Sequence, residues 1–411
     1  MSISNPNSRL SERLPETPPH LQWKSSVPSL LPLSVDYLST PRISSAHTSR
    51  STKSLKNSTQ NLTARSSEPD GRALTTRSTD RRFFGNSETP SDQTKCSLKE
   101  SGSVKAYAAS TNQGLIRNYN EDRVSIILNI MKPPNRSGEP WPRCSFFGVY
   151  DGHGGAACAD FLRDNLHQYV IRNHYFPHNP KEAIRNGFEA AERAFLELAE
   201  RNQPVERSGS CANVVLIVGD NCYVANVGDS RAVMSGDGGT KIYPLSKDHK
   251  PCEEKERQRI INNGGKVYQS TAQVQGSQIA GPYRIFPGRL SVSRTIGDIE
   301  AKMPSYNGNP NVLISTPEIK AFRIHQDFDF IILATDGIFD KMTNKEVIKS
   351  AWSCIYDSKT RNAHQLCGIA VENVMSTALN KKTTDNVTVV MVGLEGFINK
   401  IEELYGKECL S

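Results

Sequence analysis

Acidic side chains stand at the ends of strongly apolar segments in this 411-residue chain. Four of them are Glu121, Asp151, Asp336 and Asp385, and Asp122 and Asp229 lie close to similar segments. Carboxylates combined with backbone carbonyls, without cysteine ligands, are the donors that Mg²⁺ or Mn²⁺ prefers over Zn²⁺. Two cations bridged by one carboxylate would activate a water molecule and hold phosphate oxygens. The sequence therefore indicates metal-assisted phosphoryl chemistry, provided that the fold brings these acids together.

The apolar runs that lead into Asp151 and Asp336 both read as buried strands, and a glycine follows each acid. Glycine lets the backbone bend and approach a ligand closely, so the carbonyl of Gly152 would join Asp151 on a cation. His153 would face the same site. The alternative is an ordinary turn in which Asp151 caps the following helix. The repeated Asp-Gly ending favours metal ligation.

A further acidic pair, Glu121 and Asp122, precedes the strand-like segment 124–128. Neighbouring side chains of an extended chain point to opposite faces, so one of the two would serve a cation only through a bridging water. Arg117, four residues before Glu121, would reach an anion held by the same cations. Asp229 follows another apolar segment and, like the pair, is open to two interpretations, a metal ligand or a solvated turn acid.

Hydrophobic periodicity predicts the elements that must position these residues. Strands are expected at 104–108, 124–128, 146–150, 212–218, 222–227, 231–235, 328–335 and 387–394, and helices at 156–173, 180–202, 253–263, 344–356 and 363–379. The three strands between 212 and 235 are expected to form one antiparallel meander. The polar segment 268–287 is expected to be a loop that acts as a flap over the site.

Residues 1–100 differ in composition from the rest of the chain. They are rich in Ser and Thr and show no sustained helical or strand period, which predicts a disordered N-terminal tail. Most of the formal net charge of +7 belongs to this tail, so the remainder is close to balanced and nucleic-acid binding is not expected. We expect a tail at 1–100, one folded domain at 101–396 and a C-terminal extension at 397–411.

The nine cysteines form no C-x-x-C pair and are odd in number, so neither a zinc module nor a secreted disulfide framework is indicated. A reducing compartment is the simplest expectation. No apolar run approaches the about 18 residues needed to span a bilayer. The expected location is therefore the cytoplasm or the nucleus.

The ordered part of the sequence resembles the metal-dependent protein phosphatases of the PP2C (PPM) family. The resemblance covers about residues 103–394 and rests on the order and spacing of its motifs. These are Arg117-x-x-x-Glu121-Asp122, Val149-Tyr150-Asp151-Gly152-His153-Gly154-Gly155, Val227-Gly228-Asp229-Ser230-Arg231, Asp248-His249-Lys250, Leu290-Ser291-Val292-Ser293-Arg294 with Gly297-Asp298, Ala334-Thr335-Asp336-Gly337 and Asp385-Asn386-Val387.

The resemblance implies an α+β fold, an αββα four-layer sandwich of two antiparallel sheets flanked by helices. It also implies two Mg²⁺ or Mn²⁺ ions per subunit and a third, weaker site. The implied ligands are Asp151 bridging both ions, Glu121 and the Gly152 carbonyl on one, Asp336 and Asp385 on the other, Asp122 through water, and Asp229 with Asp336 at the third site.

By the same resemblance, Arg117 would bind the phosphate and His153 would protonate the leaving serine or threonine oxygen. A metal-bridged water would attack phosphorus directly, which suits a chain without the Cys-x5-Arg loop of other phosphatases. The implied protein is a monomeric serine/threonine phosphatase that acts on phosphoproteins.

Three positions depart from the family pattern, and none removes a ligand. Cys211 stands where Thr is frequent, Phe339 where Trp is common and Asn120 where Met is common. Two alternatives stay open: a scaffold that binds phosphoproteins without turnover, and a phosphohydrolase of small molecules. Loss of a metal-binding acid would favour the scaffold, but here all the acids are present.

Overall fold

The computed structural model describes residues 94–274 and 277–406. The predicted N-terminal tail, residues 1–100, lies outside these residues except for its last seven positions. The first strand, β1 (Lys95–Cys96), pairs with β2 (Ala106–Asn112). The division of the chain at residues 100 and 396 stays a prediction.

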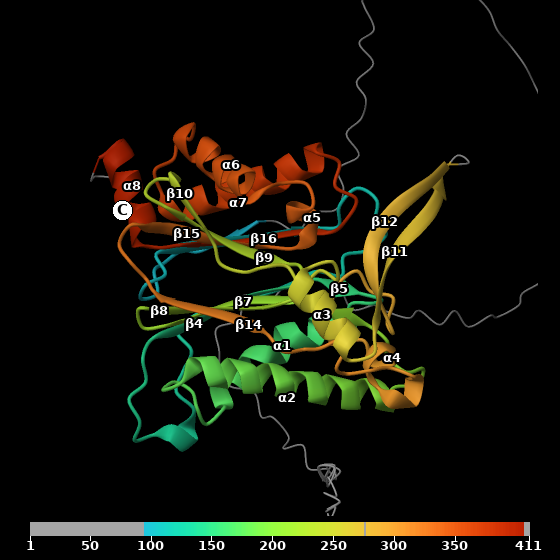
Figure 1. The fold of residues 1–411 in the computed structure, drawn as a ribbon. Coiled ribbons are helices and arrows are strands. Elements are labelled where there is room, and N and C mark those ends of the chain that lie inside the picture. Colours follow the sequence, from blue (N-terminus) through green and yellow to red (C-terminus); the bar gives the residue numbers. More distant parts are fainter. Residues whose placement is uncertain (1–93, 275–276, 407–411) are drawn as a thin grey trace, which may run out of the picture. The chain divides into compact units, whose positions relative to one another are not determined.

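Two antiparallel sheets lie one above the other in the described part of the chain (Figure 1). The six-stranded sheet runs in the order β1, β2, β16 (Val387–Gly393), β15 (Phe328–Ala334), β9 (Arg231–Gly236) and β10 (Lys241–Pro244). The five-stranded sheet runs in the order β14 (Glu318–Arg323), β8 (Asn221–Val227), β7 (Ala212–Val218), β4 (Cys144–Tyr150) and β3 (Arg123–Ile127). A small sheet joins β13 (Ile296–Gly297), β6 (Gly209–Ser210) and β5 (Gly152–His153).

Helices cover the outer face of each large sheet (Figure 1). The six-stranded sheet carries α6 (Asn344–Tyr356), α7 (Ala363–Asn380) and α8 (Glu395–Tyr405), and the five-stranded sheet carries α1 (Ala157–Arg172) and α2 (Pro180–Arg201). The shorter helices are α3 (Glu254–Asn262), α4 (Ile299–Lys302), α5 (Asp336–Phe339) and the 3₁₀ turns at Pro134–Arg136 and Pro304–Tyr306. Among the described residues, no helix combines the length and apolarity needed to cross a bilayer.

Three apolar cores fill the spaces between the four layers. One core lies between the two sheets and includes Phe147, Leu333 and Val390. The other two lie between each sheet and its helices, and are represented by Phe188 and Phe330. Strands β4, β7 and β16 are buried along their whole length, so their sequences are mostly apolar runs. The predicted αββα sandwich is therefore confirmed.

Strand register brings the acidic residues to one end of this sandwich. Arg123 of β3 lies opposite Tyr150 of β4, so the residues just before β3 and just after β4 are neighbours. Ala334 of β15 lies opposite Val389 of β16. In an antiparallel pair, the end of one strand lies beside the start of the other. The acids that follow β4, β8 and β15 are therefore close to the acids that precede β3 and β16.

The predicted meander is wrong in its third strand. β7 and β8 pair as expected, but β9 pairs with β15 and β10 in the other sheet. The chain leaves β8 through Gly228, whose φ is +101° and where a Cβ would lie 2.2 Å from Cys211 Sγ. Only glycine fits such a close, left-handed turn. Asp229 therefore lies at the crossing between the two sheets.

The predicted loop over residues 268–287 is also wrong, because most of it is a two-stranded hairpin (Figure 1). Its strands are β11 (Lys266–Val274) and β12 (Ser277–Phe286), with a register shift between Gln269 and Thr271. Most of its described side chains are exposed on both faces, so the apolar alternation that marks a strand is missing. Its action as a flap stays a prediction.

Replacing Phe147 with alanine should reveal the contribution of the core between the sheets. Phe147 is fully buried and packs edge to face on Tyr107 of the opposite sheet, with ring centroids 5.8 Å apart. We expect Phe147→Ala to lower the free energy of unfolding by about 3–5 kcal/mol, measured by urea denaturation. Leu198→Ala, on an exposed part of α2, is the control and should cost less than about 1 kcal/mol. Equal losses for the two variants would contradict the packing described here.

Candidate metal and phosphate site

Three of the predicted acids converge at the end of the sandwich. Carboxylate oxygens of Asp151, Asp229 and Asp336 all lie within 4.8 Å of one another. Burial, followed by the charge of Asp336, raises the pKa of Asp151 well above its ordinary value. Burial and Asp229 raise the pKa of Asp336 in the same way. Such a set of buried, mutually repelling oxygen donors fits a divalent cation, which would relieve the repulsion.

Asp385 and Arg117 form a charged pair beside this triplet. Arg117 Nη2 donates to Asp385 Oδ2 at 2.5 Å, and the two side chains are 47% and 30% exposed. Burial acts to lower the pKa of Arg117, but Asp385 and then Glu121 and Asp336 raise it. Asp385 in turn raises the pKa values of Asp151 and Asp336, so it belongs to the same electrostatic site.

Glu121 and Asp122 point to different partners, as alternation along an extended chain predicts. Glu121 Oε1 accepts from the backbone N–H of Gly155 at 2.5 Å. Asp122 Oδ2 accepts from the hydroxyls of Thr335 at 2.9 Å and Thr388 at 2.6 Å. Burial raises the pKa of Asp122 to about 7, against these hydrogen bonds, which lower it. Within the residues that the structure describes, Glu121, Asp122 and Asp385 stand outside the close triplet.

Gly152 packs closely against the chain that carries Glu121. A Cβ at position 152 would lie 2.6 Å from the Glu121 carbonyl oxygen, so no larger residue fits without a shift of the backbone. Gly152 itself pairs with Ser210 in the small sheet. The glycine after Asp151 therefore permits the contact between the two predicted ligand segments.

His153 is held by an acid to which the sequence interpretation gave no role. His153 Nε2 lies 2.8 Å and 3.0 Å from the two oxygens of Asp298, and the hydroxyl of Thr295 donates to Asp298 Oδ2 at 2.6 Å. Burial acts to lower the pKa of His153, but Asp298, followed by Asp229 and Glu121, raises it, and the pKa lies above its ordinary value. Asp298 has a left-handed backbone, with φ +58°. A Cβ at Gly209 would lie 2.1 Å from Asp298 Oδ2, so that glycine makes room for the pair.

Lys250 is a second residue whose role the sequence interpretation missed. Its Nζ donates to Asp229 Oδ2, and the thiol of Cys211 donates to Asp229 Oδ1 at 3.3 Å. Burial acts to lower the pKa of Lys250, but Asp229 raises it. Both Lys250 and Asp298 belong to motifs that were recognised, but neither follows a long apolar strand. Their partners come from distant segments, so spacing along the chain gave no signal.

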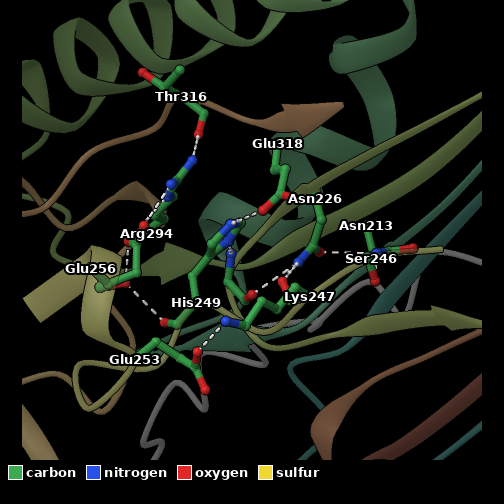
Figure 2. A network of polar contacts seen from close by, with 12 residues as sticks. Asn213, Asn226, Ser246, Lys247, His249, Glu253, Glu256, Arg294, Thr316 and Glu318 are labelled. Carbon is green, nitrogen blue, oxygen red and sulfur yellow. Dashed lines mark hydrogen bonds and ion pairs between the residues drawn. The ribbon is translucent and has the colours of Figure 1, made fainter. Parts of the chain in front are cut away.

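A polar network fixes the segment that carries Lys250 (Figure 2). Asn226 Nδ2 donates to the Lys247 carbonyl at 3.0 Å, and Asn213 Nδ2 donates to Asn226 Oδ1 at 2.9 Å. His249 Nδ1 accepts from the backbone N–H of Gly228 at 3.1 Å. Burial lowers the pKa of His249 to about 4, so the ring stays neutral at physiological pH. The network therefore joins strands β7 and β8 to the segment before α3.

Glu256 of α3 lies at the end of this network opposite Asn213 (Figure 2). Its carboxylate accepts from Arg294 Nη2 at 2.5 Å, from Ser293 Oγ at 2.6 Å and from Arg259 Nη2 at 2.7 Å. Ser293 also donates its N–H to the His249 carbonyl at 2.9 Å. Burial acts to raise the pKa of Glu256, but these donors lower it to about 2.

Comparison with known proteins finds matches to a single protein family over most of the described chain. The family model described as "Protein phosphatase 2C" matches residues 111–387, a range that contains every predicted site residue. "Probable protein phosphatase 2C 45" of Oryza sativa subsp. japonica is 36% identical over 60% of this chain and 75% of its own. "Probable protein phosphatase 2C 2" of Arabidopsis thaliana is 31% identical over 76% of this chain and 72% of its own.

Solved structures agree in fold. The crystal structure of serine-threonine phosphatase 2C from Toxoplasma gondii has a TM-score of 0.54 and 21% identity, and covers 74% of this chain and 99% of its own. The structure of a sex determining protein of C. elegans has a TM-score of 0.59 and 21% identity, over 76% of this chain and 69% of its own. At this identity the likeness concerns the fold alone.

Replacing Glu256 with glutamine should destabilise the protein in a pH-dependent way. A pKa of about 2, against 4.5 for an ordinary glutamate, means that the charged form stabilises the folded state fully above pH 4.5. This stabilisation is lost as the pH falls toward 2. We expect Glu256→Gln to lower the free energy of unfolding by about 2–4 kcal/mol at pH 7. The deficit relative to the wild type should shrink below pH 4.5, as followed by urea denaturation at pH 7, 4.5 and 3.5.

Glu253→Gln is the matched control in the same segment. Glu253 pairs with Lys247 at the surface, where both side chains are well exposed. Its replacement should cost less than about 1 kcal/mol. A deficit for Glu256→Gln that does not change with pH would show that its charge is not what stabilises the network.

Proposed function

The chain belongs to the protein phosphatase 2C family, and on this premise we propose that its acidic site hydrolyses phosphoserine and phosphothreonine in proteins with divalent cations as cofactors. The observation that carries the proposal is the convergence of Asp151, Asp229 and Asp336. These three acids come from separate strand ends, and among the described residues the side chains that donate to this triplet are Lys250 and Cys211, both on Asp229. Acids that only cap turns would not be expected to lie this close together, because their charges repel one another.

The residues present suit Mg²⁺ or Mn²⁺. Asp151 and Asp336 would hold two cations, completed by Asp385, Glu121 and the Gly152 carbonyl, with Asp122 acting through water and Asp229 forming a third, weaker site with Asp336. When bound, these cations would neutralise phosphate oxygens and lower the pKa of a water molecule. Water is the nucleophile in this proposal, because the chain lacks a Cys-x5-Arg loop.

Arg117 would bind the phosphate. Its side chain is about half exposed, and among the described residues one of the five guanidinium donors bonds a side chain, Asp385. The remaining donors suit two oxygens of a phosphate monoester. Asp385 would orient the guanidinium, and the raised pKa keeps it charged at every physiological pH.

His153 would donate the proton that the leaving serine or threonine oxygen needs. Asp298 occupies Nε2, so the donor atom in this proposal is Nδ1, which has no hydrogen-bond partner among the described residues. The Asp298 carboxylate raises the pKa of His153 and favours the protonated ring. Asp298 is thus a positioning residue that acts through His153.

Other expectations from the sequence stay predictions. They are a monomeric state, a location in the cytoplasm or nucleus, and the lack of nucleic-acid binding. Phosphoproteins are the substrates that the family implies.

Metal dependence is the first test. Phosphate release from a phosphothreonine peptide should require Mn²⁺ or Mg²⁺ and stop with EDTA. Asp336→Asn should lower kcat/KM at least about 100-fold and weaken Mn²⁺ binding measured by calorimetry, because it removes a charged donor. Asp327→Asn, at an exposed site away from the triplet, is the control and should behave as wild type. A folded wild-type protein that binds the phosphopeptide without turnover would favour a scaffold instead.

Leaving-group dependence tests His153 and Asp298 together. His153→Gln and Asp298→Gly should lower kcat on a phosphothreonine peptide by about 100-fold, because an alkoxide must be protonated as it leaves. Both should affect p-nitrophenyl phosphate much less, since nitrophenolate leaves without a proton. Glycine suits position 298 because the backbone there is left-handed.

Glu192→Gln is the control for the backbone that carries Asp298. Glu192 accepts from the N–H of Gly297 at 2.8 Å but does not touch His153. Its replacement should affect both substrates equally. If His153→Gln shows selectivity and Asp298→Gly does not, the positioning role is wrong; if neither does, His153 is not the acid.

A further inference from the structure

The loop that carries Arg117 exposes an unusual set of apolar side chains. Within residues 113–120, here called the Arg117 loop, Leu115 is 44% exposed, Ile116 68% and Tyr119 58%. Single exposed hydrophobic residues are normal on a protein surface. Three such residues within five positions concentrate exposed apolar side chains on one short loop, and concentrated apolar surface commonly marks a binding surface.

The exposure does not come from a poorly held loop. Asn386 Nδ2 donates to the carbonyls of Gln113 at 2.7 Å and Tyr119 at 3.1 Å. Asn386 Oδ1 accepts from the N–H of Glu121 at 2.9 Å. At Gly114, φ is +81° and a Cβ would lie 2.1 Å from the Asp385 carbonyl oxygen. The loop backbone is therefore fixed against residues 385–386, and its apolar side chains are presented in advance of any ligand.

Charge restricts what this surface can bind. Arg117 is the one charged side chain of the Arg117 loop, and its proposed partner is the phosphate. The loop offers no second cation to acidic neighbours of the phosphorylated residue and no anion to basic ones. What it offers beside the phosphate is apolar area.

We propose that the Arg117 loop binds apolar side chains that flank the phosphorylated residue, so that the enzyme prefers phosphosites with Leu, Ile, Val, Met or Phe two positions away. This inference rests on the proposed function, in particular on phosphate binding by Arg117. In an extended peptide, residues two positions apart point to the same side and lie about 6.5–7 Å apart. A phosphothreonine directed at Arg117 would therefore direct its second neighbours toward Leu115, Ile116 and Tyr119.

The experiment compares two phosphothreonine peptides that differ only in having Leu or Ser two positions before and after the phosphothreonine. The wild type should hydrolyse the Leu peptide with a kcat/KM about 3- to 10-fold higher, mainly through KM, because apolar area is buried in the complex. Ile116→Ser and Leu115→Ser should reduce this ratio to near one. Met131→Ser replaces a residue that is 62% exposed in another loop, and should leave the ratio as in wild type.

The possible outcomes separate this inference from the function on which it rests. Failure of the wild type to hydrolyse both peptides and p-nitrophenyl phosphate would reject the proposed function itself. Hydrolysis of both peptides at equal kcat/KM would overturn only the preference. An equal loss by Ile116→Ser on peptides and on p-nitrophenyl phosphate would show a displaced Arg117 rather than a lost contact. A concentration-dependent dimer in sedimentation that Ile116→Ser abolishes would assign the patch to a second copy of the chain, and also overturn the inference.

Discussion

Repulsion among buried carboxylates is the constraint on which the rest of this site depends. Asp151, Asp229 and Asp336 meet at less than 5 Å, and burial raises the pKa values of Asp151 and Asp336. The protein supplies partial compensation through Lys250 on Asp229 and through two threonine hydroxyls on Asp122. These donors bond Asp229 and Asp122, not Asp151 or Asp336. The remaining negative charge fits the hard divalent cations of the proposed function, because such cations would relieve the repulsion.

The sandwich holds this unfavourable cluster because its strands are fixed elsewhere. The three apolar cores lie between the layers, β4 and β16 are buried along their whole length, and β15 is buried in all but its first residue. A shift of one residue in their registers would move every side chain from one core into another, where it does not fit the packing. Burial of apolar surface in the layers thus stabilises a fold that the acids themselves oppose.

The sequence allowed the acids to be found because both features that mark them are local: an apolar run and a polar residue at its end. Asp151 and Asp336 are examples, and the sandwich followed from the family motifs around them. Features that depend on distant contacts were not predictable in this way. β9 is not part of the predicted meander, because its partner, β15, lies nearly one hundred residues later. Among its described residues, the hairpin β11–β12 has no buried face, so its sequence lacks the apolar alternation that predicts a strand. Asp298 and Lys250 were overlooked for the same reason, since their partners, His153 and Asp229, are remote in sequence.

Two of the cation–carboxylate pairs at the site, Arg117–Asp385 and His153–Asp298, differ in a way that suits their different proposed tasks. Arg117 and Asp385 are partly exposed, so solvent weakens their attraction, which suits the proposed exchange of Asp385 for a phosphate oxygen. His153 and Asp298 are less accessible, and Asp298 is fixed by Thr295, by a left-handed backbone and by the space that Gly209 leaves. The exposed, weakly held environment of Arg117 suits a group that must bind and release a ligand. The fixed environment of His153 suits a group that must deliver a proton along one direction, because its orientation costs no further entropy when the substrate arrives.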